Sequence, residues 1–343
     1  MASRITRRRL LIFGPLAFLL MGLLWFMFVP PSGRATTKVV VIKKGMPLKK
    51  ISLLLKQEGI IRNEDLFVAM TTVVGKKAEI KAGEYELQTR MLPFQVLGAL
   101  LQGQVKRHLV TIPEGYTVIQ IGQLLQDLNI ADREEFVEKT SSPTFIASLG
   151  IAPFPPTRKR LTLEGYLFPD TYHFVKEMNP EQIIQMMVSR FKKVFTSDLI
   201  ERSSQMGFSE RDTIILASIL EKETSLSGEK PLISAVFHNR LKKKIPLQSD
   251  PTVIYGIEKF DGNLKKEHLV KPTPYNTYLF LGLPPAPICN PGRDSMVAAV
   301  SPAPVPYLYF VSKNDGSHHF SCTMEEHNRA IMKYQTKNSL TKK

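Results

Sequence analysis

The sequence predicts an α+β protein with an N-terminal transmembrane helix, a small α/β module and a larger α+β domain. Three observations support this prediction. Residues 10–29 form an apolar stretch without a charged side chain. A short β-branched segment followed by apolar residues at helical spacing then occurs twice. Beyond residue 160, longer helical patterns precede a stretch rich in proline, glycine and aromatic residues, which is typical of loops over a scaffold.

The apolar stretch determines the expected topology. Its length of about 20 residues is what a helix needs to cross the hydrocarbon core of a bilayer. Four arginines precede it and Pro30-Pro31 end it, so the positive-inside rule places a tail, residues 1–9, in the cytoplasm. A cleaved signal peptide is the alternative, but the stretch is longer than a usual signal core and no A-x-A-like site follows. We expect a single-pass protein of the inner (cytoplasmic) membrane, with a linker over residues 30–37 and everything beyond the linker in a periplasmic or extracytoplasmic position.

Composition and charge restrict the partners. The hydrophobic fraction of 43% is sufficient for folded cores, and the net charge of +15 indicates an acidic partner such as nucleic acid, an anionic membrane or an anionic polymer. No long basic arm, zinc-finger spacing or RNA-binding aromatic motif is present, so we expect no nucleic-acid partner. Cys289 and Cys322 are too few for a disulfide framework. The sequence is consistent both with one bridge between them and with two separate thiols. We expect no metal and no cofactor, because His318, His319 and His327 lack an accompanying ligand pattern.

One short pattern occurs twice. Residues 38–42 have the β-branched content of a strand, Gly45 ends it, and apolar residues at helical spacing follow. The same order returns 70 positions later around Gly115, with the shared pattern I-x-x-G-x-x-[LV]-x-x-I-x-x-LL. With a further helical stretch and strand, the first copy resembles a LysM-like module over residues 38–107. LysM modules bind the glycan chains of peptidoglycan. A plain packing unit without a ligand is the alternative.

The rest of the chain divides into two parts. Residues 108–160 hold the second βα unit and a connecting loop, which four prolines between residues 141 and 160 indicate. Residues 161–343 form the last domain. Its expected helices cover residues 180–195, 209–224 and 231–241, where apolar residues recur at helical spacing or a capping residue precedes them.

A candidate catalytic acid lies at residues 214–224, which read IILASILEKET. As a helix, this segment is apolar around its circumference and therefore buried, up to Glu221. Burial would favour the protonated carboxyl group that a general acid needs. The alternative is that Glu221 and Glu223 are both solvated in an exposed last turn. Two helix positions correspond to about 200°, so the two carboxyl groups point apart and only one can face a cleft.

Amide, hydroxyl and tyrosine side chains between proline and glycine residues indicate a sugar-binding groove. Asp250 could instead cap a helix that begins at Pro251, and Arg240 could form an ion pair rather than contact a lactyl carboxylate. Tyr166, Asp170 and Tyr172 either line the groove or belong to the core. The candidate groove residues are Asn239, Arg240, Gln248, Asp250, Thr252, Tyr255, Tyr275, Asn276 and Thr277.

Five long motifs in one order carry a family resemblance. They are A-S-I-L-E-K-E-T, V-F-H-N-R-L, L-Q-S-D-P-T-V-I-Y-G, Y-N-T-Y-x-x-x-G-L-P-P-x-x-I-x-N-P-G and P-Y-L-Y-F-V. With the N-terminal anchor and the LysM-like unit, they resemble the endolytic murein transglycosylase family (MltG, YceG-like) over nearly the whole chain after Pro31. The resemblance is most specific between Leu216 and Val311.

This resemblance implies an activity and partners. The expected reaction is cleavage of the MurNAc–GlcNAc β-1,4 bond in nascent peptidoglycan, which leaves a 1,6-anhydro-MurNAc end. Glu221 matches the family's catalytic glutamate and would act first as acid and then as base. The expected partners are peptidoglycan glycan strands and wall synthases of the penicillin-binding class. The alternative is a non-catalytic, membrane-anchored peptidoglycan-binding scaffold for such synthases.

Overall fold

The chain divides into two units: residues 1–108 with 173–177, and residues 109–172 with 178–343. The computed structural model describes residues 21–22, 25–26, 29–43, 45–75, 80–152, 154 and 162–336. The predicted tail and transmembrane segment therefore lie outside the described residues, apart from five positions between Met21 and Val29. Among the residues that are described, no helix has the length and apolar character needed to cross a membrane. Mixed helices and strands in both units confirm the α+β class.

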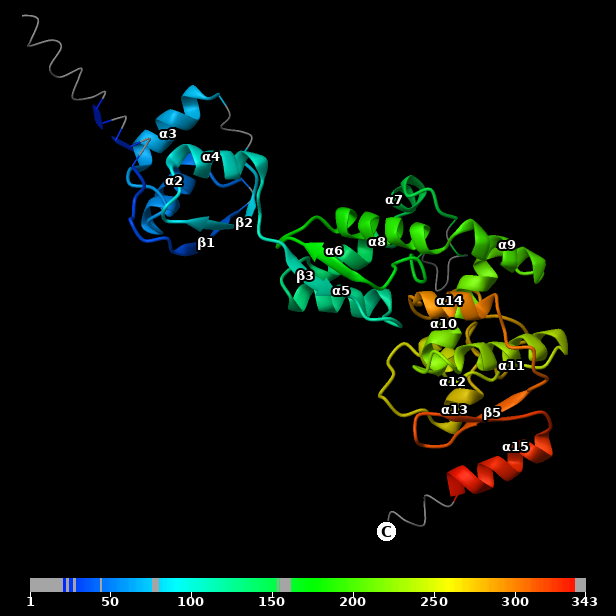
Figure 1. Ribbon diagram of the computed structural model, residues 1–343. Helices are drawn as coiled ribbons and strands as arrows, with labels where there is room; N and C mark the ends of the chain where they lie inside the picture. Colours follow the sequence, from blue (N-terminus) through cyan, green and yellow to red (C-terminus); the bar gives the residue numbers. More distant parts are fainter. Residues whose placement is uncertain are drawn as a thin grey trace, which may run out of the picture. The chain divides into compact units, whose positions relative to one another are not determined.

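Among the described residues of the first unit, two antiparallel strands pair with each other and three helices accompany them (Figure 1). Thr37 pairs with Gln88 and Ile42 with Gly83. Every second residue of the strands faces the core, as in Val40 and Ile42, which are 1% and 3% exposed. The elements are β1 (Thr37–Ile42), α2 (Leu48–Gln57), α3 (Glu64–Val73), β2 (Gly83–Gln88) and α4 (Pro93–Gln102). The likeness of this unit to a LysM-like module stays a prediction.

The second unit begins with a related order of elements. Strand β3 is followed by helices and then by strand β4, which pairs with β3. Helix α8 comes after β4. The expected loop over residues 141–160 is wrong in part, because Pro143 begins a short helix, α7, with Phe145 and Ile146 buried. The elements are β3 (His108–Thr111), α5 (Val118–Asp127), α6 (Arg133–Lys139), α7 (Pro143–Ser148), β4 (Thr171–Phe174) and α8 (Pro180–Val194).

Equivalent residues of the sequence repeat have equivalent conformations. Gly45 and Gly115 both have positive φ, at 78° and 76°, in the turn that joins strand to helix. A side chain would strain either turn, because L residues avoid this region. Ile51 and Ile121 are both buried in the helix that follows. The repeat therefore reflects one strand–turn–helix unit used twice.

The remainder of the second unit surrounds one buried helix, α10. It packs against α9, α11, α12 and α14, and Figure 1 shows α10, α11 and α14 together. A short antiparallel pair, β5–β6, lies against α15. The elements are α9 (Ser197–Gln205), α10 (Glu210–Glu223), α11 (Lys230–Lys242), α12 (Asp250–Gly256), α13 (Lys266–Leu269), α14 (Arg293–Ala299), β5 (Tyr309–Ser312), β6 (His318–Ser321), α15 (Met324–Ile331) and a π-helical turn (Met332–Thr336).

The local sequence explains where α10 begins and how it is buried. Ser209 is the N-cap, and its hydroxyl accepts the N–H of Asp212 at 3.2 Å while Asp212 accepts the N–H of Ser209 at 3.0 Å. This capping box satisfies amides that the helix leaves unpaired. The residues from Thr213 to Leu220 are all buried. The expected helix that is buried all round is thus present, and it delivers Glu221 to its C-terminal end.

Candidate functional site

The carboxyl group of Glu221 is buried where α10, α11 and α14 meet. Its side chain is 6% exposed, so the solvated-turn alternative does not hold for it. Lys230, in the first turn of α11 and 3% exposed, places its Nζ 3.2 Å from Oε1. Oε2 accepts the N–H of Gly292 at 2.9 Å and the hydroxyl of Ser295 at 2.7 Å. The carboxyl group is therefore held by three donors rather than by an apolar wall.

The segment that supplies Gly292 is fixed to the buried face of α10. The hydroxyl of Ser218 accepts the N–H of Ile288 at 3.0 Å and donates to a carbonyl within the helix. The thiol of Cys289 donates to the carbonyl of Ser218 at 3.3 Å, and both cysteines are free. The only polar residue in the apolar run thus positions the chain beside Glu221.

Asn290 joins this segment to the rest of the unit. Its Oδ1 accepts the N–H groups of Gly165 and Leu167, each at 2.9 Å. Its Nδ2 donates to the carbonyl of Tyr116 at 3.0 Å and to Glu164 at 2.8 Å. The side-chain oxygen thus accepts two hydrogen bonds and the side-chain nitrogen donates two, which is the full capacity of an amide. The residue is 1% exposed. Asn290 therefore acts as a structural junction next to the site.

Glu164 is a second buried carboxyl group in this region. It accepts the N–H of Val118 at 3.1 Å and the hydroxyl of Tyr255 at 3.2 Å, in addition to Asn290. Burial raises the pKa of Glu164 to about 8, although its hydrogen bonds oppose the shift. Glu164 links Tyr255, a predicted groove residue, to Val118, the first residue of α5.

Glu223 points to a different set of residues from Glu221, as the helical spacing predicts. The hydroxyl of Ser249 donates to its Oε1 at 2.5 Å. Burial raises the pKa of Glu223 to about 7, with Asp250 adding to the shift and Arg240 opposing it. Of the two glutamates in the last turn of α10, Glu223 is therefore the one in contact with the segment that carries the predicted groove residues Gln248 and Asp250.

Most predicted groove residues hold loops together. Thr252 and Thr277 share a hydroxyl hydrogen bond of 2.8 Å and are buried, and Tyr275 packs edge-on against Tyr255 with ring centroids 4.8 Å apart. The Asn276 amide is fully buried and donates to the carbonyls of Leu269 and Lys271. The exposed members of the set are Gln248 and Asp250, and Tyr255 is partly exposed.

Asn239 and Arg240 fix backbone rather than face solvent. The amide of Asn239 donates to the carbonyls of Val305 and Tyr307, each at 2.9 Å. The guanidinium of Arg240 is 8% exposed and donates to the carbonyl of Leu308 at 2.7 Å, with further bonds to the 246–248 segment. These bonds differ from the ion pair suggested as one alternative for Arg240, and its contact with a lactyl carboxylate stays a prediction.

The structure also defines the contacts of Asp250 and of the candidates Tyr166, Asp170 and Tyr172. The N-cap of α12 is Ser249, so the capping role suggested for Asp250 is wrong, and Asp250 instead accepts the hydroxyl of Tyr278 at 2.7 Å. Tyr166 and Tyr172 are core residues, 5% and 7% exposed. Asp170 pairs with Arg190 at 2.6 Å.

Four residues around Glu221 escaped prediction from the sequence. They are Glu114, Lys230, Gly292 and Ser295, from three separate segments. A lysine in the first turn of a helix opposes the helix dipole, so Lys230 carried a signal that it has another partner. The N-P-G sequence before α14 was a second signal, because a glycine in such a turn indicates that another group packs closely against the backbone.

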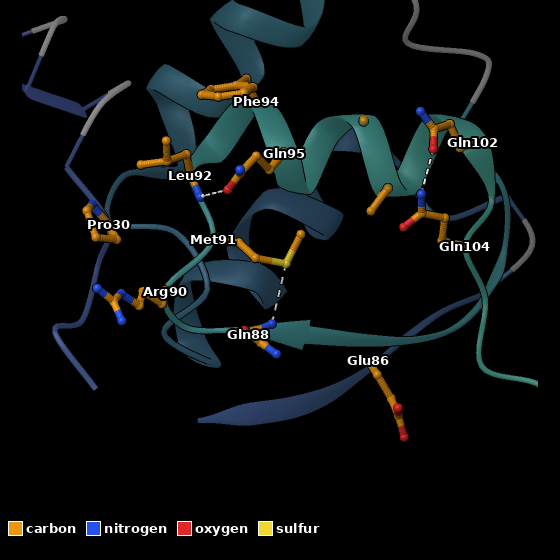
Figure 2. A pocket seen from close by; sticks show the side chains of 12 residues that line it. Pro30, Glu86, Gln88, Arg90, Met91, Leu92, Phe94, Gln95, Gln102 and Gln104 are labelled. Atoms are coloured by element: carbon orange, nitrogen blue, oxygen red, sulfur yellow. Dashed lines mark hydrogen bonds between the residues drawn. The ribbon is translucent and has the colours of Figure 1, made fainter. Parts of the chain in front are cut away.

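Polar side chains, apolar side chains and one aromatic ring line a cavity of about 950 Å³ in the first unit. Figure 2 shows most of its residues on β2, on the turn that follows, and on α4, with Pro30 before these elements and Gln104 after them. Phe94 is 45% exposed at its edge, so an aromatic ring is available to a ligand. The lining consists of Pro30, Glu86, Gln88, Arg90, Met91, Leu92, Phe94, Gln95, Gly98, Ala99, Gln102 and Gln104. Amides beside an aromatic face are the groups that bind sugar hydroxyls and sugar rings.

The chemistry open to the Glu221 site is acid–base chemistry. The carboxyl group is within hydrogen-bonding reach of an ammonium, an amide and a hydroxyl, so it can hold and release a proton at a fixed position. Within the described ranges, no three histidine, cysteine, aspartate or glutamate side chains are grouped to hold a metal ion.

Comparison with known proteins assigns a family. A model of the YceG-like family matches residues 40–333. An endolytic murein transglycosylase of Bacillus subtilis (strain 168) is 33% identical over 312 residues, which cover 87% of this chain and 85% of that protein. The relative with the same description from Streptococcus pneumoniae serotype 2 (strain D39) is 29% identical, and the match spans 58% of its length.

A solved structure agrees with these matches. The crystal structure of a YceG-like protein from Listeria monocytogenes aligns with a TM-score of 0.60 at 32% identity, covering 87% of this chain and all of that one. Because the family match extends over most of the chain, from the first unit to α15, the chain belongs to the YceG-like family.

Proposed function

We propose that this protein is an endolytic murein transglycosylase, a lyase that cleaves the MurNAc–GlcNAc β-1,4 bond within nascent peptidoglycan strands. The observation that carries the proposal is the carboxyl group of Glu221, which is buried and held by three donors at the end of α10. The relatives described as endolytic murein transglycosylases support the substrate class.

The proposed reaction uses Glu221 twice. Glu221 first donates a proton to the glycosidic oxygen, and the bond from that oxygen to C1 of MurNAc breaks. The carboxylate then takes the proton of the C6 hydroxyl, whose oxygen bonds to C1 and closes the 1,6-anhydro ring. The intramolecular attack gains from proximity, and neither water nor a protein nucleophile is consumed, unlike in glycosidases that use two carboxylates.

The surroundings of Glu221 have a consequence for the first step. Lys230, Gly292 and Ser295 all donate to the carboxyl group. Their bonds fix its orientation toward a substrate, as acid–base catalysis requires.

The remaining parts of the proposal concern address and partners. The apolar segment over residues 10–29 anchors the chain in the cytoplasmic membrane, with its N-terminus inside and its catalytic unit outside. The LysM-like first unit holds glycan strands in its amide-lined cavity. Wall synthases of the penicillin-binding class are the proposed protein partners, since they make the strands that the enzyme cleaves.

The test is to incubate the purified full chain with purified sacculi and to identify the released fragments by mass spectrometry. We expect fragments with 1,6-anhydro-MurNAc ends, formed by the wild type and lost in Glu221→Gln. Binding to sacculi without any cleavage would instead support the non-catalytic scaffold, for which the cavity of the first unit and the net charge of +15 would suffice. Fragments with ordinary reducing ends would replace the proposed reaction by hydrolysis.

A further inference from the structure

The turn between β3 and α5 brings another carboxyl group to Glu221. A Cβ at Gly115 would lie 3.5 Å from Cγ of Glu221, so the turn is in contact with the side chain. The N–H of Gly115 donates to the carbonyl of Asn290 at 3.0 Å, and Lys222 donates to the carbonyl of Gly115 at 3.4 Å. These bonds fix the turn, and Glu114 precedes Gly115 within it.

Gly292 lies between the two carboxyl groups. Its N–H donates to Glu221 at 2.9 Å. A Cβ at Gly292 would overlap the carboxyl group of Glu114. The backbone does not require glycine here, because the φ of Gly292 is −77°, which any residue adopts. Glycine at this position therefore leaves the space that the Glu114 carboxyl group occupies.

The charges around the pair favour a proton on Glu114. Burial raises the pKa of Glu114, the charge of Glu221 raises it further, and Lys230 opposes the shift. Glu114 is nevertheless an exposed residue, whereas the side chain of Glu221 is 6% exposed. The charged groups that face the pair are Lys222 from α10, Lys230 from α11 and Asp294 from α14.

We propose that Glu114 is a second functional carboxyl group of this site, which holds a proton and exchanges it with Glu221 across Gly292. The proposal rests on the function proposed for Glu221. The proton passes from a Glu114 oxygen to a Glu221 oxygen, directly or through one water, and Glu221 delivers it to the glycosidic oxygen. The proton taken from the C6 hydroxyl then returns to Glu114, so the pair ends each turnover as it began.

The sequence repeat provides an independent argument. In the repeat, position 114 corresponds to position 44, where the sequence has lysine. The strand–turn–helix unit itself therefore does not require an acid at this place. The acid is specific to the copy that reaches Glu221, which fits a role in the site better than a role in the turn.

The first test measures the pH dependence of turnover on sacculi for the full chain and for Glu114→Gln. We expect a 10- to 100-fold lower rate, because the proton source is lost. We also expect the alkaline limb of the profile to move to lower pH, because a like charge no longer helps the pair to retain its proton. Glu114→Asp should restore part of the rate and the position of this limb. Glu258→Gln, an exposed glutamate outside the site, is the control and should behave as wild type.

The second test displaces Glu114 without changing its chemistry. In Gly292→Ala the new methyl group overlaps the Glu114 carboxyl group, so we expect a loss of rate and the same alkaline shift as in Glu114→Gln. The matched control is Gly228→Ala, since a Cβ at Gly228 meets nothing within 4 Å. Thermal unfolding of each variant establishes that it is folded.

The outcomes separate the two proposals. If Glu114→Gln keeps the rate and pH profile of the wild type, Glu114 has no functional part. If its rate falls but the profile and the response to Glu114→Asp do not change as expected, Glu114 is a packing residue and the inference is wrong. If Glu221→Gln itself retains wild-type activity, the proposed function fails, whatever Glu114 does.

Discussion

Glu221 and Lys230 form an ion pair that is almost entirely removed from water. Their side chains are 6% and 3% exposed, and 3.2 Å separates Nζ from Oε1. Two ions in such a place are stabilised only if their remaining hydrogen bonds are made. Gly292 and Ser295 provide those bonds on the carboxyl side. The pair is therefore a positioning device whose two members depend on each other.

Removing one member of this pair should be costly. Lys230→Met leaves the carboxyl group of Glu221 buried without its cation, and we expect a loss of about 3 kcal/mol in the free energy of unfolding. Lys242→Met, on an exposed position of the same helix, should change it by less than about 1 kcal/mol. Urea denaturation of the purified proteins measures both values. Equal, small losses for the two variants would mean that the buried pair has no such role.

Glu164 gives a pH-dependent prediction at the same scale. An unfolded glutamate titrates near pH 4.3, whereas burial raises the pKa of Glu164 to about 8. Between these values the native state holds a proton that the unfolded state has lost, so stability falls as pH rises through this window. The amide in Glu164→Gln does not titrate, so this variant lacks the pH dependence that the Glu164 carboxyl group contributes. From pH 5 to pH 8 it should therefore lose less stability than the wild type, by on the order of 3 kcal/mol.

Urea midpoints at several pH values test this comparison. Glu223, whose pKa burial raises to about 7, contributes in the same direction but is present in both proteins. Its effect cancels when the two curves are subtracted. Parallel curves for wild type and Glu164→Gln over this range would show that Glu164 titrates normally in the folded protein.

At the scale of elements, helix α10 organises the site. It is buried from Thr213 to Leu220, and it carries Glu221 and Glu223 on different sides of its last turn. The segment around Gly165 lies directly against it, because a Cβ at Gly165 would come within 2.8 Å of Ile214 and 2.6 Å of Pro287. Close approach of this segment lets Asn290 bind the N–H of Gly165.

Two glycine substitutions separate packing from backbone strain. Gly165 and Gly207 both have positive φ, at 89° and 77°, but a Cβ at Gly207 meets nothing within 4 Å. Gly207→Ala should cost about 1–2 kcal/mol of stability through strain alone. Gly165→Ala should cost about 1–3 kcal/mol more, because the methyl group also overpacks the face of α10. Thermal or urea unfolding measures the difference, and equal costs would contradict the close packing.

The elements were more predictable than the site. Residues 180–195 and 231–241 were expected to be helical and form α8 and α11 within two residues at each end, because apolar residues recur on one face. Glu221 stood out because an apolar run ends at it abruptly. The residues around Glu221 could not be predicted in this way, since Glu114 and Gly292 are each more than 70 positions from it and no local pattern links them to it. Thr252 and Asn276 were predicted to line a groove, and in the structure their side chains donate to nearby backbone carbonyls, as short polar side chains often do.

At the scale of the whole molecule, the chemistry and the strand binding that we propose belong to different units. Glu221 and its partners lie in the second unit, and the amide-lined cavity lies in the first. If the cavity binds glycan strands, the two units make separable contributions: one to the affinity for long substrates and one to the rate of bond cleavage. This separation is a property that substitutions can test.

Phe94 is the residue with which to test it. Phe94→Ala removes an exposed ring at the edge of the cavity, and the loss of a ring contact worth about 1 kcal/mol should weaken binding to glycan strands about fivefold. The KM for long strands should rise while kcat is unchanged. Val73→Ala, an exposed apolar position elsewhere in the first unit, is the control. An unchanged KM for Phe94→Ala would exclude the cavity as the strand-binding site.

The most direct measurement compares Glu221→Gln with Glu223→Gln. Both residues lie in the last turn of α10, so the two variants differ only in which carboxyl group becomes an amide. The rate of release of anhydro-ended fragments from sacculi should fall by about 10²–10⁴-fold in Glu221→Gln, and by far less in Glu223→Gln, with both proteins folded. A wild-type rate in Glu221→Gln, or the larger loss in Glu223→Gln, would contradict the assignment of the proton-transfer role to Glu221.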